Sequence, residues 1–235
     1  MIPQEAGFNE DRAKAYDDRI RQHIAGYETL HGLSETILAA ELSADAALLI
    51  AGVGTGMEIR EWAPKHPGWK FVGVDPSEAM IAVARDKIRF EGVSDRVRLT
   101  VGSVATLPVE SVFDAATLLL VLHFVPDHGE KEALLAALAD RLKPGAPLVI
   151  ATLFGDPSTT RYKRMISLTK AWAMAHGMDE PKAGELCNPA RPDLHVVPED
   201  RIKDLFRYAG FIDVQRVYQA FAIGVWFARK PRPHK

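Results

Sequence analysis

Three glycines at alternate positions, Gly52, Gly54 and Gly56, follow an apolar run in the stretch LLIAGVGTG. A glycine turn between a strand and a helix exposes backbone N–H groups and a helix N-terminus to a ligand, because no side chain blocks the approach. Asp75 lies 23 residues after Gly52, where a carboxylate can accept hydrogen bonds from both hydroxyls of a ribose. This combination predicts a nucleoside-binding site.

The order of the glycines separates the possible nucleosides. The dinucleotide fingerprint G-x-G-x-x-G has its third glycine at a position occupied here by Met57, and this disfavours a nicotinamide cofactor. The phosphate-loop pattern GxxxxGK followed by Ser or Thr is absent, so ATP hydrolysis lacks its chief sequence signal. Of NAD and S-adenosylmethionine, the turn therefore favours the second.

Apolar runs that alternate with helical stretches position these residues. Continuous apolar strands separated by helices are typical of a parallel sheet covered on both faces. The predicted strands of this part are ALLIAGV, KFVGVD, RVRLTVGS, FDAATLLLVLHF and PLVIATLF. The last two runs, IDVQRVYQAF and IGVWFARK, are joined without room for a helix and must pair antiparallel. We expect a Rossmann-like α/β fold with a seven-stranded, mainly parallel sheet that has one antiparallel strand.

The pattern predicts a single domain over residues 1–235 with an N-terminal helical cap over residues 1–44. Within the cap, residues 10–42 have a helical amphipathic pattern that we expect to break near Gly26 or Gly32. The charged segment EDRAKAYDDRIR of this cap is expected to be a solvated helix face.

A lid-like insertion over residues 156–197 interrupts the strand and helix alternation. We expect a helix at about 159–176, then an irregular segment, KAGELCNPARPDLHVVP, before the last helix. Long insertions near the edge of a site commonly form binding loops, so this one is expected to cover an acceptor. Contacts between two copies of the chain are the alternative explanation of its apolar and basic residues.

Charge and cysteine content exclude several functions. The chain has 29 Lys and Arg against 31 Asp and Glu and a pI near 6.5, so no global basic field calls for nucleic acid or an anionic membrane. The lone Cys187 excludes an internal disulfide and a cysteine-based zinc site, and no metal is expected. No apolar run approaches the roughly 20 residues of a membrane span. We expect a soluble, cytoplasmic protein.

Taken in order, these segments resemble the class I S-adenosylmethionine-dependent methyltransferases. LLIAGVGTG is similar to the family's first motif, FVGVDPSEAM to its ribose-binding segment, VGSVATLP to its adenine segment, and FDAATLLLVLHFV and LKPGAPLVIATL to its fourth and fifth strands. The resemblance implies methyl transfer to a small-molecule acceptor by in-line displacement, with S-adenosylhomocysteine as the product. The cofactor contacts that it implies, besides the three glycines, are Asp75, Pro76, Met80, Ser103, Val104, Leu120 and Val121.

Two positions depart from the family's pattern. The acid two residues before the first glycine, which helps to bind the methionine amino group, is Ile50, and the usual acid after the third-strand glycine is Ser103. A lost charge-assisted hydrogen bond costs on the order of 1.5–3 kcal/mol. A protein that binds the cofactor without catalysis is therefore an alternative function.

The two ends of the chain carry a narrower resemblance. FNEDRAKAYDDRIRQHIAGYETLHGL and AGFIDVQRVYQAFAIGVWFARK are similar to the carboxy-S-adenosylmethionine synthases, which make a carboxylated cofactor for tRNA wobble-uridine modification. Those enzymes carry a lid arginine at a position that roughly matches Cys187, with Arg191 nearby. Synthase activity is a second alternative.

Further candidates follow from position in the expected fold. His123, just past the fourth strand, is expected to act as a general base or to contact the substrate, with strand-end packing as the alternative. Tyr16 and Arg19 could close over the methionine carboxylate, or be solvated. Aromatic residues that could wall the acceptor site, or belong to the core or the insertion, are Phe124, Phe154 and Tyr162.

Overall fold

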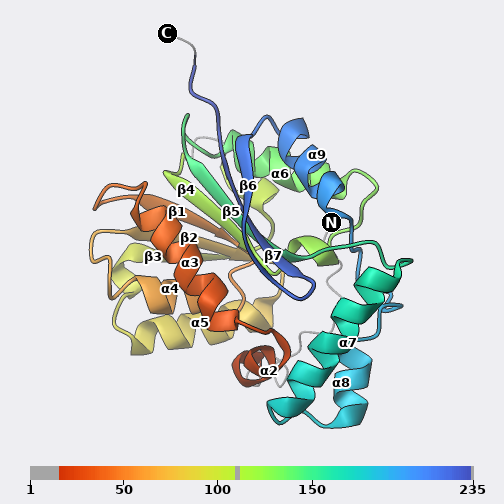
Figure 1. Ribbon diagram of the computed structural model, residues 1–235. Coiled ribbons are helices and arrows are strands. Elements are labelled where there is room, and N and C mark those ends of the chain that lie inside the picture. Colours follow the sequence, from red (N-terminus) through yellow and green to blue (C-terminus); the bar gives the residue numbers. More distant parts are fainter. Residues whose placement is uncertain (1–15, 109–111, 234–235) are drawn as a thin grey trace.

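The computed structural model describes residues 16–108 and 112–233. Its strands are β1 (Ala47–Ala51), β2 (Lys70–Asp75), β3 (Val97–Val101), β4 (Ala115–Leu119), β5 (Pro147–Leu153), β6 (Ile212–Ala220) and β7 (Ile223–Arg229). They form one sheet in the order β3-β2-β1-β4-β5-β7-β6 (Figure 1). The first five strands are parallel, and β7 is antiparallel to both of its neighbours. The predicted fold class is confirmed.

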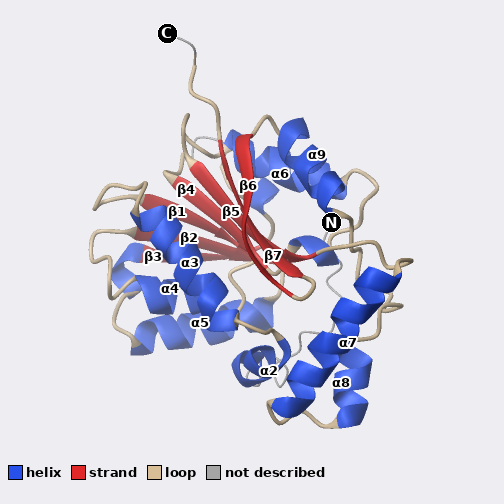
Figure 2. Cartoon of the chain, in the orientation of Figure 1, coloured by secondary structure: helices blue, strands red, loops and turns tan. Residues whose placement is uncertain are grey.

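Helices cover both faces of the sheet (Figure 2). They are α2 (Tyr16–His23), α3 (Tyr27–Ala39), α4 (Met57–Trp62), α5 (Glu78–Phe90), α6 (Glu130–Asp140), α7 (Thr160–Ala175), α8 (Glu180–Leu186) and α9 (Glu199–Tyr208). Because successive strand residues point to opposite faces, β1 contributes to two cores. Leu48 and Ile50 pack with α3, α4 and α5, while Leu49 and Ala51 pack with α6 and α9. In the described part of the chain, no helix is both long and apolar enough to cross a membrane.

The N-terminal cap breaks at Gly26, one of the two predicted positions. Gly26 has φ +72°, and a Cβ atom there would lie 2.1 Å from the hydroxyl oxygen of Tyr218. A left-handed conformation and this close approach both require glycine. Gly32, the other predicted position, lies inside α3. The break turns α2 away from α3, so that α2 packs against α7 of the insertion (Figure 1).

The insertion contains one more helix than expected. The helix predicted at 159–176 is α7, and the Thr159 hydroxyl caps its start by accepting a hydrogen bond from the N–H of Tyr162. The expectation of an irregular segment from residue 182 onward was wrong for its first part, which belongs to α8. The Asp179 carboxylate accepts a hydrogen bond from the N–H of Lys182 at 2.9 Å, and Pro181 lies in the first turn. Both features start a helix.

The fourth strand is shorter than its apolar run. The run continues to Phe124, but β4 ends at Leu119 because Leu120 has φ +60°. A left-handed conformation is costly for a branched residue and persists where the surroundings enforce it, which is common at functional sites. A 3-10 turn, η3 (Leu122–Phe124), follows. The chain is thus turned out of the sheet at the edge where the predicted site lies.

Candidate active site

The glycine turn after β1 is open to a ligand at its centre. Gly52, Gly54 and Gly56 have φ values of +75°, +51° and +86°. A Cβ atom at Gly52 would lie 2.2 Å from a methyl carbon of Val121, whereas a Cβ atom at Gly54 would meet no neighbouring atom of the described residues within 4 Å. The outer glycines shape the turn, and Gly54 leaves free space above its backbone. Val121, a predicted cofactor contact, therefore packs beneath the turn.

Asp75 lies at the end of β2, beside this turn. One carboxylate oxygen accepts the N–H of Gly54 at 2.9 Å, and the other accepts the N–H of Ser77 at 2.9 Å. The side chain is nearly buried, and burial raises the pKa of Asp75 above its ordinary value despite these two hydrogen bonds. Each oxygen of an ionised carboxylate has a second lone-pair direction. Asp75 is thus held rigidly while it keeps the capacity to accept ribose hydroxyls.

The predicted adenine contacts gather around the ends of β2 and β3, which are neighbours in the sheet. Met80, in the first turn of α5, and Val104, in a 3-10 turn after β3, are buried. Pro76 directly follows β2, Ser103 directly precedes the 3-10 turn of Val104, and both are half-buried. These four residues and Asp75 come from one edge of the sheet, so the structure brings the predicted nucleoside contacts to the same region.

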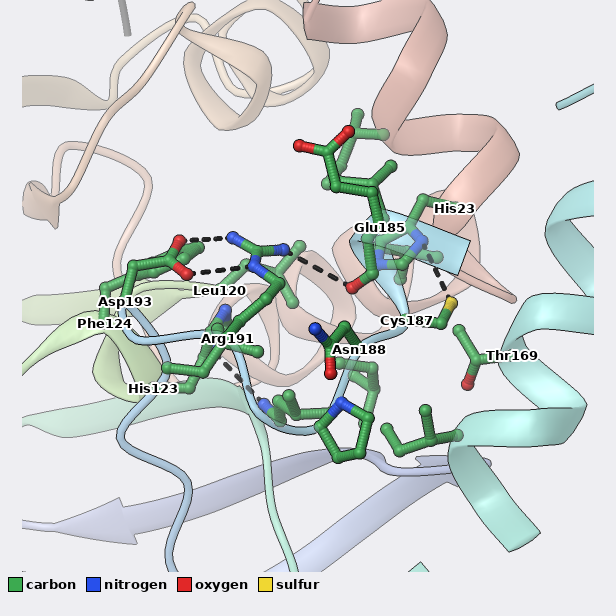
Figure 3. Close-up of a pocket in the computed structure, with 18 of the residues that line it drawn as sticks. His23, Leu120, His123, Phe124, Thr169, Glu185, Cys187, Asn188, Arg191 and Asp193 are labelled. Atoms are coloured by element: carbon green, nitrogen blue, oxygen red, sulfur yellow. Dashed lines mark hydrogen bonds and ion pairs between the residues drawn. The ribbon is translucent and has the colours of Figure 1, made fainter. Parts of the chain in front are cut away.

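A cavity of about 610 Å³ opens at the carboxyl end of β4 and β5. Its walls come from α2, η3, α7, α8 and the segment that follows α8, as Figure 3 shows for the labelled residues. Predicted site residues that line it are Tyr16, Arg19, Leu120, His123, Phe124 and Tyr162. Phe154 is not among the lining residues: its ring packs edge-on against Trp226, with centroids 4.9 Å apart. The cap and the insertion thus meet over the predicted site.

His123 is held in one orientation by the end of β5. Its Nδ1 atom accepts the N–H of Leu153 at 3.2 Å and lies 3.1 Å from the hydroxyl oxygen of Thr152. An Nδ1 atom that accepts a hydrogen bond carries no proton, so the neutral ring has its proton on Nε2. Burial lowers the pKa of His123 to about 3, and the nearby Lys131 and Arg191 charges act in the same direction. The ring is therefore suited to donate from Nε2 rather than to accept a proton there.

Lys131 fixes the turn that carries His123. Its side chain is fully buried, and Nζ donates hydrogen bonds to the carbonyl oxygens of Leu122 at 2.6 Å and Val125 at 2.7 Å. Burial lowers the pKa of Lys131 to about 8. These two bonds clamp both ends of η3, and they hold His123 against β5.

Asp17 ties α2 to the glycine turn, and the expectation of a solvated face was wrong for this residue. Its carboxylate accepts the hydroxyl of Thr55 at 2.5 Å and Nζ of Lys87 at 2.7 Å, and Arg60 lies 3.4 Å away. Burial alone would raise the pKa of Asp17, but the hydrogen bonds from Lys87 and Thr55 outweigh it and lower the pKa. These contacts join residues 38 to 70 positions apart, so no local pattern revealed them.

The part of the cavity wall that follows α8 contains charged and polar contacts that the sequence did not predict. Arg191 is paired with both carboxylate oxygens of Asp193 and donates to the carbonyl oxygen of Leu186 at 3.4 Å (Figure 3). The Cys187 sulfur lies 4.0 Å from Nδ1 of His23 on α2. Burial lowers the pKa of His23 to about 4, so this wall contact is made by a neutral ring. Within the described residues, no group of three or more His, Cys, Asp or Glu side chains could hold a metal ion.

Comparison with known proteins finds similarity to methyltransferases and to a related synthase. The profile of a family described as a methyltransferase domain matches residues 49–148. A carboxy-S-adenosyl-L-methionine synthase from Marinobacter nauticus is 25% identical over 224 residues, which cover 93% of this chain and 88% of that protein. The matched domain spans the glycine turn, Asp75 and His123.

Solved structures share the fold. A 1,6-didemethyltoxoflavin-N1-methyltransferase from Burkholderia thailandensis, with bound 1,6-didemethyltoxoflavin and S-adenosylhomocysteine, superposes with a TM-score of 0.62 at 23% identity, covering 94% of this chain and 86% of that one. An O-methyltransferase family protein from the same organism has a TM-score of 0.63 at 16% identity. There the match covers 97% of this chain and 62% of the longer one.

Proposed function

We propose that this chain, which belongs to the class I S-adenosylmethionine-dependent methyltransferases, methylates a small-molecule acceptor bound in the cavity of about 610 Å³. The observation that carries the proposal is the position of this cavity, at the strand edge where Leu120 and His123 leave the sheet. A volume of this size is within the range of small-molecule sites. The cap and the insertion enclose it with α2, α7 and α8.

The residues of the strand edge fit S-adenosylmethionine. Gly54 leaves free space above its backbone, and the carboxylate of Asp75 beside it keeps the capacity to accept ribose hydroxyls. Met80 and Val104 supply apolar surface for an adenine ring. When bound, the cofactor supplies a methyl group activated by a positively charged sulfur. These residues would hold its adenosine part, and Leu120 would face its methionine part.

The transfer that we propose is an in-line displacement, for which alignment of the acceptor and exclusion of water matter more than acid–base chemistry. Phe124 and Tyr162 line the cavity, and burial raises the pKa of Tyr162 to about 12, so its hydroxyl stays protonated. His123 donates from Nε2 to an acceptor oxygen or nitrogen. General-base action by this ring, one of the two predicted roles, is disfavoured by its fixed tautomer and its low pKa.

Carboxy-S-adenosylmethionine synthesis is the second candidate, because similarity to such a synthase extends over 93% of this chain. The position of the expected lid arginine argues against it. Cys187 carries no charge of that kind, and the guanidinium of Arg191 is already paired with Asp193. Mass spectrometry of the nucleoside that copurifies with the protein separates the two functions, since the synthase product is heavier by one carboxylate group.

Labelling identifies the acceptor class directly. Protein is incubated with S-adenosylmethionine carrying a deuterated methyl group and with separate small-molecule, RNA and protein fractions of a cell extract. We expect the label in a compound of the small-molecule fraction and its loss with the Asp75→Ala variant, which lacks the ribose contact. Label found only in RNA or protein contradicts a small-molecule acceptor.

A further inference from the structure

Glu58 is a buried carboxylate beside the glycine turn. It is the second residue of α4, and only 4% of it is exposed. Its Oε1 atom lies 3.4 Å from the hydroxyl oxygen of Thr117 on β4. Thr117 is the register partner of Ile50 on β1, and partners in adjacent strands point to the same face of a sheet. The Glu58 carboxylate therefore lies on the face to which Ile50 points.

No cationic side chain of the described residues neutralises this carboxylate. In residues 16–108 and 112–233, no Lys, Arg or His side chain forms an ion pair with Glu58. Burial raises the pKa of Glu58 to about 7, and the charge of Asp75 adds to this effect. A buried carboxylate without a cationic partner is costly, and such a group is a candidate for binding a ligand's opposite charge.

The surroundings of Glu58 identify the part of the ligand that it faces. Asp75, which marks the ribose end, and Tyr16, which lines the acceptor cavity, are both near enough for their charges to interact with Glu58. A cofactor whose ribose lies at Asp75 and whose methyl group reaches the cavity must place its amino-acid portion in this region. That portion carries an ammonium group, the cation that Glu58 lacks.

We propose that Glu58 binds the α-ammonium group of the cofactor's methionine portion, in place of an acid at position 50. This inference rests on the proposed function and specifies one contact of the same site. Ile50 is fully buried in the cluster that also contains Ile59 of α4 and Leu119 of β4. An acid at position 50 would place a second carboxylate near that of Glu58, and two like charges at this depth repel each other. An apolar residue at position 50 therefore goes together with an acid at position 58.

Calorimetric titration with two nucleosides isolates this contact. S-Adenosylhomocysteine carries the amino-acid portion, whereas 5′-methylthioadenosine shares its adenosine and sulfur but lacks the ammonium and carboxylate groups. We expect Glu58→Gln to weaken S-adenosylhomocysteine binding about 10- to 100-fold, the range of a charge-assisted hydrogen bond, and 5′-methylthioadenosine binding less than about 2-fold. Glu61→Gln, an exposed change on the same helix, is the matched control and should leave both affinities unchanged.

The outcomes separate this inference from the proposed function. Equal losses for both nucleosides in the Glu58 variant, or no loss for S-adenosylhomocysteine, overturn the role of Glu58 while cofactor binding stands. Binding of neither nucleoside by the unaltered protein overturns the proposed function as well.

Proton release by the unaltered protein tests the same contact without a variant. Among the described residues, the titratable groups that interact with Glu58 are Asp75, Tyr16 and Tyr27, of which Asp75 serves the part common to both nucleosides. Because Glu58 is about half protonated near pH 7 and an ammonium group favours its ionised form, S-adenosylhomocysteine should displace a fraction of a proton at this pH. Titrations in two buffers with different heats of ionisation measure it. The contact between Glu58 and the ammonium group is excluded if 5′-methylthioadenosine releases the same fraction of a proton.

Discussion

The N–H of Leu153 donates a hydrogen bond to Nδ1 of His123 at 3.2 Å, and this bond determines which nitrogen of the ring can face an acceptor. Nδ1 is occupied by the backbone of β5, so the proton resides on Nε2. His123 lines the cavity from a turn that Lys131 clamps at both ends. His123 is therefore held in one orientation, with Nε2 as its hydrogen-bond donor.

Substitutions at His123 should follow donor capacity. His123→Ala removes the donor, and we expect turnover of the acceptor found by labelling to fall about 10- to 100-fold, as for the loss of one positioned hydrogen bond, with S-adenosylhomocysteine affinity unchanged. His123→Gln keeps an N–H group and should retain most of the turnover. Because the pKa of His123 is about 3, the rates of the unaltered protein and the Gln variant should have the same pH dependence between pH 5 and 8. The donor role is contradicted if the rate of the unaltered protein falls below about pH 6.5 and the rate of the Gln variant does not.

Asp17 should make the attachment of α2 sensitive to acid. Its pKa is lowered in the folded protein, so its contribution to stability is present above its unfolded pKa of about 4 and is lost as the pH falls through the lower, folded pKa. Asp17→Asn should lower the melting temperature at pH 7 and reduce the loss of stability below pH 4. Asp18→Asn, on the exposed side of α2, is the control. If the two variants unfold identically in acid, the contacts of Asp17 with Thr55 and Lys87 do not stabilise the attachment of α2.

Lys131→Met should destabilise the fold by about 2–4 kcal/mol, because two buried carbonyl oxygens lose their partner. Chemical denaturation at neutral pH measures the free energy of unfolding. Lys163→Met, an exposed change on α7, should have almost no effect. An unaltered free energy of unfolding in the Lys131 variant shows that the turn holds without this clamp.

The fold and the proximity of the glycine turn to Asp75 could be predicted because their signals are local. The apolar run, the three glycines and Asp75 lie within one strand, helix and strand unit, and the structure places them together at one sheet edge. The contacts of Asp17 and Arg191 escaped prediction for the opposite reason. Asp17 contacts the glycine turn from 38 positions away, and Arg191 enters the cavity wall from a segment with no periodic pattern.

Phe154 shows a different limit of sequence reasoning. An aromatic residue at a strand end has the same local pattern whether it faces a ligand or a core. Its packing against Trp226 depends on the register of β5 with β7, which connects distant segments of the chain. Position along the sequence could not decide between these two environments.

Alanine substitutions at Gly52 and Gly32 should have opposite effects on stability, and only the change at Gly52 should weaken ligand binding. Gly52→Ala would bring its methyl group to 2.2 Å from Val121 at a left-handed φ, so we expect both a lower melting temperature and weaker S-adenosylhomocysteine binding. The added methyl group of Gly32→Ala, inside α3, meets no neighbouring atom of the described residues within 4 Å and should stabilise the helix by about 1 kcal/mol. Thermal melts with and without ligand compare the two. Equal ligand-induced shifts in both variants would show that the glycine turn does not contact the ligand.

Position 50 offers a test of the arrangement around Glu58. Ile50→Asp should lower stability without tightening S-adenosylhomocysteine binding, because it buries a second carboxylate on the same face. Ile50→Asp combined with Glu58→Gln restores a single acid, and its affinity should exceed that of Glu58→Gln alone. Tighter binding by the Ile50 variant on its own means that position 50, and not Glu58, is the natural place for the acid.

Calorimetric titration with S-adenosylmethionine tests the central claim, cofactor binding at the glycine turn and Asp75, most directly. The account predicts micromolar binding to the unaltered protein at one site and, for Asp75→Ala, a loss of at least about 10-fold, as for the removal of a hydrogen-bonded carboxylate. Absence of binding, or equal binding by the two proteins, contradicts it.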